Sequence, residues 1–270
     1  MVTDSEPGDG RLAWHRIGRS LVAPKPAARD FETILGIEAR HGFRSTFFLL
    51  HDRYWARQGA RYRFSDPEIR EIAALIREAG CEIGLHGGYY RFNDPAAYRE
   101  SRDAIRRAFS VEAVGIRNHL LRFSGPETWR AQQAAGFAYD ATFGDQTIPG
   151  PRDGRDRPFW AVQPGPDSKG GLVELPLTVM DGTLFRHRRL RGRDALDAAW
   201  IAVVPVIGAG GLVTLLWHNN YFNEPEYADW QWVYERLLER LAEQRPWCAT
   251  GAEIAAWWRT QPAAAANKQG

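Results

Sequence analysis

Three histidines and one arginine stand out, because each closes or follows an apolar run. His86 ends "CEIGLH" and is followed by two glycines, and His218 ends "LVTLLWH". Arg117 and His119 lie two residues apart in "VGIRNHLLRF". Imidazoles bind metals and exchange protons near neutral pH. These positions therefore predict a hydrolytic or metal site, with a structural histidine as the alternative for each one taken alone.

His86 raises the question most sharply, because metal-binding histidines usually come in pairs. Four residues further on, where a partner would stand, the sequence has Tyr90. A neutral phenol is a poor substitute for an imidazole as a ligand. Three interpretations stay open: half of a metal site, a site completed from another strand, or a structural histidine.

The elements that must position these residues follow from the apolar pattern. Buried apolar runs alternate with helical patterns along the chain, and residues 144–170 form a long loop rich in proline and glycine. The strands are predicted at 45–50, 81–85, 113–117, 172–179 and 212–217, and helices at 28–40, 95–109 and 226–244. This alternation predicts a parallel sheet wrapped by helices. In such barrels the chemistry collects at the carboxyl ends of the strands, which is where the ionisable residues fall.

The composition indicates one large domain without nucleic-acid chemistry. The chain has 270 residues, of which 44% are hydrophobic, and a net charge of +2. We predict a single domain over residues 1–260 and a frayed tail over 261–270. The densest basic stretch, "RHRRLRGR" at 186–193, is interpreted as a solvated loop, with a contact to an acidic glycan or a phosphate as the alternative.

No membrane span or disulfide framework is expected. The uncharged residues 198–217 are broken by Pro205 and by glycines, so they predict a helix, a turn and a strand. Cys81 and Cys248 stand in apolar contexts and are expected to be buried thiols. The start of the chain lacks the pattern of a signal peptide, so we expect a soluble, cytoplasmic protein.

Several segments resemble the polysaccharide deacetylase-like domains of carbohydrate esterase family 4. They are "GFRSTFFLL", "CEIGLHGG", "GIRNHLLRF", "GFAYDATFG", "LVELPLTVMDGTLF" and "LLWHNN". The combination of "EIGLH", "RNHLLRF" and "LLWHN" is similar to a subgroup near sugar and O-antigen pathways. The resemblance implies an α/β fold, a distorted (β/α)7 barrel, that removes N- or O-acetyl groups from carbohydrates, often with zinc.

The resemblance also implies roles for single residues. The acidic pair after the first strand corresponds to Asp4 as general base and Glu6 as metal ligand. Arg117 corresponds to the arginine that holds the base, and His218 to the general acid. Only three residues precede Asp4, whereas strands usually have about five or six. We therefore expect a first strand that is short or begins upstream, with a frayed acidic terminus as the alternative.

The sequence departs from the family pattern at two positions. Tyr90 replaces the second histidine of the usual pair, and His119 stands where the family has a proline. We predict that Glu6, His86 and His119 together bind a divalent ion, zinc by preference, because catalytic zinc takes three protein ligands and keeps one open position. The alternative for His119 is a hydrogen bond within the rim.

The substrate is predicted to be a carbohydrate. Aromatic faces stack on sugar rings, amides bind hydroxyl groups and arginines suit an acidic sugar. The predicted contacts are Tyr90, Arg122, Arg152, Trp217 and Asn219. Two other functions stay open: a catalytically degenerate barrel that only binds sugars, and an amidohydrolase that acts on a non-acetyl amide. Retention of His218 favours an enzyme, since a binding domain needs no general acid.

Overall fold

The computed structural model describes residues 28–54, 58–165 and 170–261. Asp4 and Glu6 lie outside these residues, and so does the predicted tail from 262 onward. The strands are β1 (Thr46–Leu50), β2 (Glu82–Gly87), β3 (Gly115–Asn118), β4 (Tyr139–Asp140), β5 (Phe159–Val162), β6 (Leu172–Glu174), β7 (Val179–Met180) and β8 (Leu215–Leu216). The predicted strands at 45–50, 81–85 and 113–117 are confirmed within two or three residues at each end, and only residues 215–216 of the predicted strand at 212–217 pair as a strand.

The helices follow the amphipathic patterns of the sequence. They are α2 (Ala28–His41), α3 (Pro67–Glu78), α4 (Pro95–Phe109), α5 (Pro126–Ala134), α6 (Gly192–Gly208), α7 (Ala228–Glu243) and α8 (Gly251–Arg259). Two starts are explained by capping: Asp94 accepts hydrogen bonds from the backbone of α4, and Thr250 with Glu253 forms a capping box on α8. Short turns follow several strands: η1 (His119–Leu121), η2 (Arg152–Gly154), η3 (Thr183–His187), η4 (Asn219–Tyr221) and η5 (Pro225–Tyr227).

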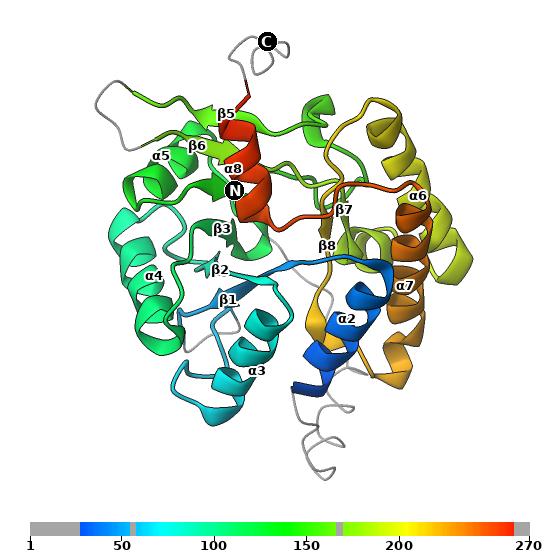
Figure 1. Ribbon diagram of the computed structural model, residues 1–270, viewed down its shortest axis with the longest axis horizontal. Coiled ribbons are helices and arrows are strands. Elements are labelled where there is room, and N and C mark those ends of the chain that lie inside the picture. Colours follow the sequence, from blue (N-terminus) through cyan, green and yellow to red (C-terminus); the bar gives the residue numbers. More distant parts are fainter. Residues whose placement is uncertain (1–27, 55–57, 166–169, 262–270) are drawn as a thin grey trace, which may run out of the picture.

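The strands form two sheets, with the orders β1-β2-β3-β4-β6-β5 and β7-β8. All pairs are parallel except β5 with β6. Figure 1 shows the helices arranged around the outside of the strands. The predicted α/β class with a parallel sheet is confirmed. Among the described residues the strands do not close into a ring, since β1 pairs only with β2 and β8 only with β7.

Two predictions about the second half of the chain are wrong. Residues 172–179 are not one strand: β6 and β7 belong to different sheets. Pro176 lies between them, and it has no N–H for a ladder. The segment 144–170 is also not only a loop, because it contains η2 and the edge strand β5, which runs antiparallel to β6.

The core lies between the strands and the surrounding helices. One cluster joins α3 and α4 to the sheet through Ile76, Ile105 and Ile116, which are fully buried. A second cluster packs α2, α6 and α7 around β7 and β8, and includes Val203 and Val233. In Figure 1, α2 and α7 lie together beside β8, in agreement with this cluster.

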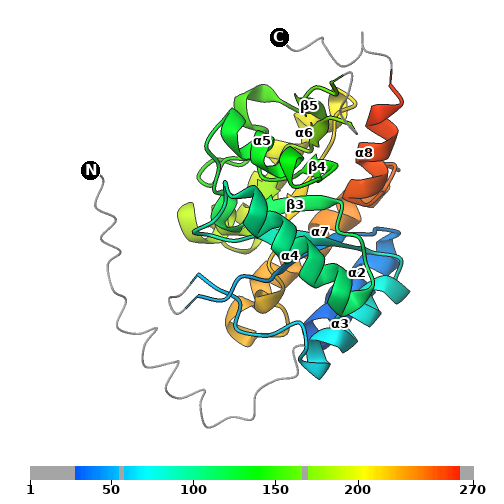
Figure 2. The same ribbon diagram turned by 90° about the vertical axis from the view of Figure 1, so that its left-hand side faces the viewer.

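Helix α8 covers the end at which the strands begin. Its first N–H, of Gly251, donates to the Thr46 hydroxyl, and that of Ala252 donates to the Glu82 carboxylate. The Arg259 guanidinium donates to the carbonyls of Ala138 and Gly171. Figure 2 shows α8 along one side of the molecule. The carboxyl ends of the strands lie at the end of the sheet opposite to α8.

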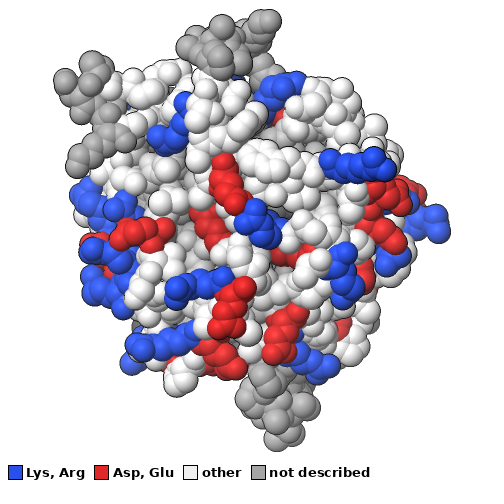
Figure 3. Space-filling model, in the orientation of Figure 1, with Lys and Arg blue, Asp and Glu red and all other residues white. Residues whose placement is uncertain are grey.

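The surface carries mixed charge. On the face drawn in Figure 3, basic and acidic side chains are interspersed, without a broad field of one sign. In the described parts of the chain, no helix has the length and apolar character that a membrane crossing requires. The uncharged segment 198–217 forms the end of α6, a turn and β8, as predicted. Pro205 lies within α6 and does not end it, whereas the turn follows at the glycines after it.

Candidate active site

Two histidines from neighbouring strands meet at the carboxyl end of the sheet. His86 on β2 is paired in register with Arg117 on β3, and His119 follows two residues later. Side chains at these positions share one face of the sheet. Nε2 of His86 lies 3.0 Å from Nδ1 of His119. The two imidazoles that were predicted to share a site are thus in direct contact, and the metal ion that they would share stays a prediction.

The neighbours of this pair decide which ring nitrogens carry protons. Nε2 of His119 lies 2.8 Å from Oε1 of Gln58. An amide oxygen only accepts hydrogen bonds, so Nε2 of His119 is the donor and its Nδ1 presents a lone pair to His86. Nδ1 of His86 is buried and has no hydrogen-bond partner among the described residues.

Both imidazoles are held in the neutral state. Burial, and next the nearby His119 and His218, lower the pKa of His86 well below its usual value. Burial and His218 also lower the pKa of His119. Neutral imidazole is the form that binds a metal ion.

A tight turn fixes His119 in place. Leu120 and Leu121 have φ angles of 51° and 47°, in the left-handed region that side chains other than glycine rarely adopt. The side chain of Asn118 holds this turn, because its Nδ2 donates to the carbonyl of Arg122 and its Oδ1 accepts from the Tyr98 hydroxyl. Strained turns of this kind concentrate at functional sites.

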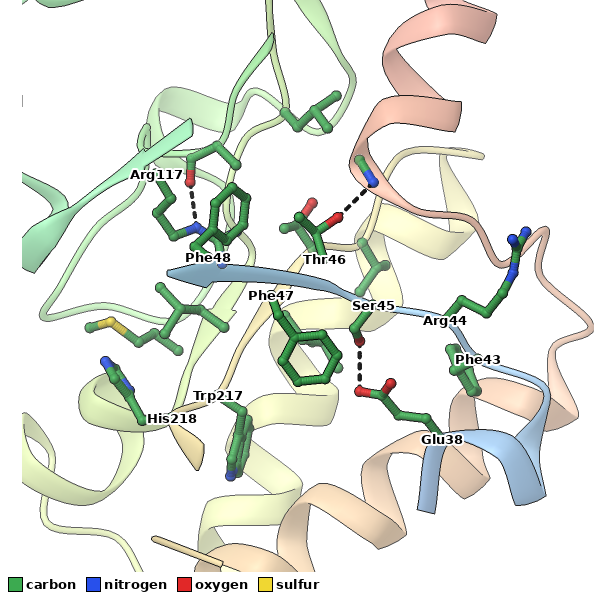
Figure 4. A pocket seen from close by; sticks show the side chains of 18 of the residues that line it. Glu38, Phe43, Arg44, Ser45, Thr46, Phe47, Phe48, Arg117, Trp217 and His218 are labelled. Atoms are coloured by element: carbon green, nitrogen blue, oxygen red, sulfur yellow. Dashed lines mark hydrogen bonds between the residues drawn. The ribbon is translucent and has the colours of Figure 1, made fainter. Parts of the chain in front are cut away.

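Arg117 is a buried cation with little compensation. Its side chain is 8% exposed, and its Nε donates to the carbonyl of Ala141 at 2.8 Å. The guanidinium carbon lies 4.7 Å from the centre of the Phe48 ring, and Figure 4 shows the two side chains beside each other. Burial lowers the pKa of Arg117 to about 10, against the opposing effect of Tyr139 and two carboxyl groups. It is therefore charged at neutral pH, yet within the described ranges no carboxylate forms an ion pair with it.

His218 is held by an aspartate from the adjacent strand. Asp181 follows β7 and is fully buried. Its Oδ1 lies 2.8 Å from Nδ1 of His218, and its Oδ2 accepts from the backbone N–H of the same residue at 2.7 Å. Burial would lower the pKa of His218, but the charge of Asp181 and its hydrogen bond outweigh that effect and raise it. Nε2 of a protonated His218 is left available to donate to a substrate.

These groups border one cavity of about 970 Å³, which includes His86, Arg117, His119 and His218 in its wall. Every residue from 43 to 50 and from 210 to 219 also borders it. Side chains of a strand alternate between its two faces. A space bordered by consecutive residues must therefore lie along the edge of the strand. The cavity runs between the free edges of β1 and β8, with Phe47 and Phe48 on opposite sides of β1 (Figure 4).

The predicted substrate contacts divide into two groups. Trp217 and Asn219 border the cavity. Trp217 packs against Phe185 and Tyr234, with ring centres 5.9 and 5.3 Å away. The described wall of the cavity does not include Tyr90, which is 55% exposed and packs edge-on against Tyr54.

The two predicted arginines also lie outside that wall. The guanidinium of Arg122 is held between the rings of Tyr89 and Phe92, at 4.4 Å from each centre. Arg152 lies over Phe143 and near the carboxylate of Asp153, with Nε 3.8 Å from Oδ2. Their assignment to substrate binding stays a prediction.

Sequence reasoning missed two polar partners in the site. Asp181 directly follows the apolar pair of β7, and His218 closely follows β8. The position of Asp181 at a strand end is the feature of the sequence that indicates a role in the site. The prediction of one strand over 172–179 obscured that signal. Gln58 carried no signal, because a single loop amide is not distinguished by its type or its neighbours.

A buried carboxyl pair was also missed. Asp140 and Glu174 are opposite each other on β4 and β6, and both are fully buried. Trp129 donates to Glu174 at 2.7 Å. Burial raises the pKa of both carboxyl groups, and the proximity of Asp140 raises that of Glu174 further. The protonated form of this pair is therefore favoured more than that of exposed carboxyl groups.

The comparisons with known proteins give the fold. No protein-family model and no curated protein matches the sequence. A solved structure from Mycobacterium smegmatis, assigned as a polysaccharide deacetylase, superimposes with a TM-score of 0.66 at 20% identity, over 94% of this chain and 84% of the other. The chain has the polysaccharide deacetylase fold. The Xyl-CE4 domain of a multidomain xylanase from the hindgut metagenome of Trinervitermes trinervoides gives a TM-score of 0.50 at 15% identity, over 89% and 88% of the two chains.

These likenesses confirm the resemblance to polysaccharide deacetylases at the level of the fold. The more specific similarity to the O-antigen subgroup stays a prediction. Function depends on the site and not on the fold, so the activity has to be argued from the residues around the cavity.

Proposed function

We propose that the protein is a metal-dependent hydrolase that removes an acetyl or similar acyl group from an amino sugar or a polysaccharide. One observation carries the proposal: His218, which is held by the buried Asp181, borders the same cavity as the neutral His86–His119 pair. Hydrolysis of an amide requires a proton donor near the leaving nitrogen and a group that polarises the carbonyl, which neutral imidazoles supply when they release their shared proton and bind a metal ion.

The two imidazoles fit a metal ion. Their facing nitrogens are 3.0 Å apart, near the separation of about 3.3 Å that two ligands of one tetrahedral zinc have. The described residues include no group of three His, Cys, Asp or Glu side chains placed to hold a metal. We propose Glu6 as the third ligand to a divalent ion, most suitably zinc. When bound, the ion supplies a Lewis acid that polarises the acyl carbonyl and acidifies water.

Arg117 supports the assignment of Asp4 as general base. A buried guanidinium is costly unless an anion compensates it. The described residues provide one carbonyl for its Nε and no ion pair. We propose that Asp4 is the missing anion. The cation would keep the Asp4 carboxylate ionised and oriented, so that it accepts the proton of the attacking water.

The free edges of β1 and β8 offer a place for the segment that carries these carboxylates. The carbonyl of Ser45 points to β2, where it accepts from the N–H of Glu82. The backbone N–H and C=O groups of successive strand residues point to opposite sides of the strand. Because those of Ser45 point to β2, those of Thr46 and Phe48 point to the cavity. We propose that Asp4 and Glu6, which lie outside the described residues, supply the carboxylates that act beside His86 and His218.

His218 completes the proposed reaction. The amine of an amino sugar is a very poor leaving group unless it is protonated as it departs. The raised pKa of His218 keeps its imidazole charged to higher pH, and Asp181 fixes Nδ1, so Nε2 delivers the proton. Trp217 and Asn219 border the space where the sugar would lie.

The test is release of acetate from N-acetylglucosamine oligosaccharides, both neutral and uronate-containing. Protein treated with a chelator should be inactive and should recover when zinc is added. Asp4→Asn should lower kcat by roughly 10²–10⁴-fold, whereas Asp9→Asn, a matched change in the same segment, should not. Full activity after complete metal removal would refute the metal, and equal effects of the two variants would refute Asp4 as the base. Sugar binding without acetate release would favour the binding-only barrel.

A further inference from the structure

One cation of the basic stretch 186–193 belongs to the cavity. Within this stretch only Arg186 and His187 border it. Both lie on η3, a π-helical turn that begins two residues after Asp181. Turns of this type are rare and occur frequently at functional sites. The segment that positions the partner of His218 thus also brings an arginine to the same cavity.

Arg186 is held in place by an aromatic residue. Its Nη2 donates to the Tyr221 hydroxyl, and its guanidinium carbon lies 5.2 Å from the centre of the Tyr221 ring. The Tyr221 ring lies 6.0 Å from that of His218. Trp230 packs against Tyr221, with ring centres 4.1 Å apart. A single packed ring therefore links the guanidinium to the proposed proton donor.

The charge of Arg186 is not compensated by the residues that the structure describes. No carboxylate there forms an ion pair with it, whereas Arg191 of the same stretch pairs with Asp229 at 3.9 Å. Asp181 is occupied by His218. Arg186 thus adds to the wall near His218 a cation that no described carboxylate pairs with, and such a cation attracts a ligand of negative charge.

We infer that Arg186 binds an acidic group, a carboxylate or a phosphate, on the sugar whose acyl group is removed. The guanidinium presents a planar fork of donors that matches either group. Tyr221 reduces the freedom that Arg186 would lose on binding, which favours affinity. The inference rests on the proposed function for its location, and it narrows the substrate class to acidic amino sugars or their acidic oligosaccharides.

Calorimetric binding of three probes tests this inference apart from catalysis. The probes are a hyaluronan tetrasaccharide, which carries carboxylates, N-acetylglucosamine 1-phosphate, which carries a phosphate, and neutral chitotetraose. Arg186→Gln removes the charge but keeps a polar side chain of similar length. Arg188→Gln is the matched control, because Arg188 is exposed on the same stretch and does not border the cavity.

The wild-type protein should bind at least one acidic probe roughly tenfold more tightly than chitotetraose, and Arg186→Gln should remove most of this preference. Arg188→Gln should keep it. The acidic probe whose affinity falls in Arg186→Gln shows whether Arg186 binds a carboxylate or a phosphate. Equal affinity for acidic and neutral probes, equal losses in both variants, or no binding of either acidic probe would overturn the inference. If Arg186→Gln loses the preference for acidic probes and the wild-type protein releases no acetate, the anion site would be supported and the proposed activity rejected.

Discussion

The carboxylate of Asp181 contacts His218 at two points, through the ring Nδ1 at 2.8 Å and through the backbone N–H at 2.7 Å. The contact joins the carboxyl ends of β7 and β8, which are parallel neighbours. It fixes the tautomer and the position of the imidazole at once. Because the carboxylate is fully buried, solvent screens its effect on His218 only weakly.

Asp181→Asn should move the alkaline limit of activity to lower pH. His218 must be protonated to act as an acid, so kcat falls as the pH rises through its pKa. Asp181 raises that pKa, and the neutral amide removes the attraction. The pH profile of kcat measures the shift. Asp229→Asn, which changes a half-buried carboxylate paired with Arg191 outside the cavity wall, should leave the limit in place. An unmoved limit in Asp181→Asn would exclude His218 as the titrating acid.

His218→Gln and His119→Gln should separate the acid from the metal site. We expect His218→Gln to lower kcat by roughly 10²–10⁴-fold and to retain the metal. His119→Gln should lose metal and activity together, since it removes a proposed ligand. Elemental analysis of the purified variants provides the readout. Full metal occupancy in His119→Gln would make His119 a hydrogen-bonding residue of the rim.

Gln58→Leu should weaken metal binding while it leaves both histidines in place. Gln58 accepts from Nε2 of His119 at 2.8 Å and so orients Nδ1. Loss of such a supporting contact typically costs 10–100-fold in metal affinity or activity. Competition with a chromogenic chelator measures the affinity. Gln133→Leu is a control, because Gln133 contacts the Gly170 carbonyl and not the site; equal effects would show that the loss is general.

Asp140→Asn should change how stability depends on pH. The pKa values of Asp140 and Glu174 are raised, so the folded state holds a proton that the unfolded state releases. The associated stability is complete below the unfolded carboxyl pKa of about 4 and is lost as the pH rises through the folded values, at up to about 1.4 kcal/mol per pH unit.

The amide introduced by Asp140→Asn would replace the shared proton with a permanent N–H donor toward Glu174. Urea unfolding between pH 5 and 8 should therefore show a smaller loss of the free energy of unfolding in this variant than in the wild type. Asp103→Asn, which alters an exposed pair with Arg106, should retain the wild-type slope. The same slope in all three proteins would mean that the carboxyl pair does not share a proton.

The sequence predicts best those parts of the fold that depend on local pattern. The apolar runs of β1 and β2 and the amphipathic repeats of α2, α4 and α7 are local features, and they were placed within a few residues. The separation of β6 from β7 depends on which neighbours each strand finds, which no local pattern encodes. Pro176 marks the break, but the pairing of β7 with β8 is a tertiary event.

The candidate site was predictable in its residue types and less so in its contacts. The end-of-strand position located His86, Arg117 and His218, because parallel strands bring their carboxyl ends together. The partners of these residues are 37 positions away in the case of Asp181 and His218, and 61 in the case of Gln58 and His119. Such pairs follow from register and loop geometry, which the sequence does not display.

The unpaired edges of β1 and β8 among the described residues affect how a shortened form of the protein is expected to behave. Unpaired strand edges are templates for other chains. Among the described residues both edges lack a strand partner and border one cavity, so a chain shortened to begin at α2 is expected to pair with a second copy through them. A separate peptide with the sequence of residues 1–10, which contains Asp4 and Glu6, would then be expected to restore activity to the shortened chain in trans if these two carboxylates act at the cavity.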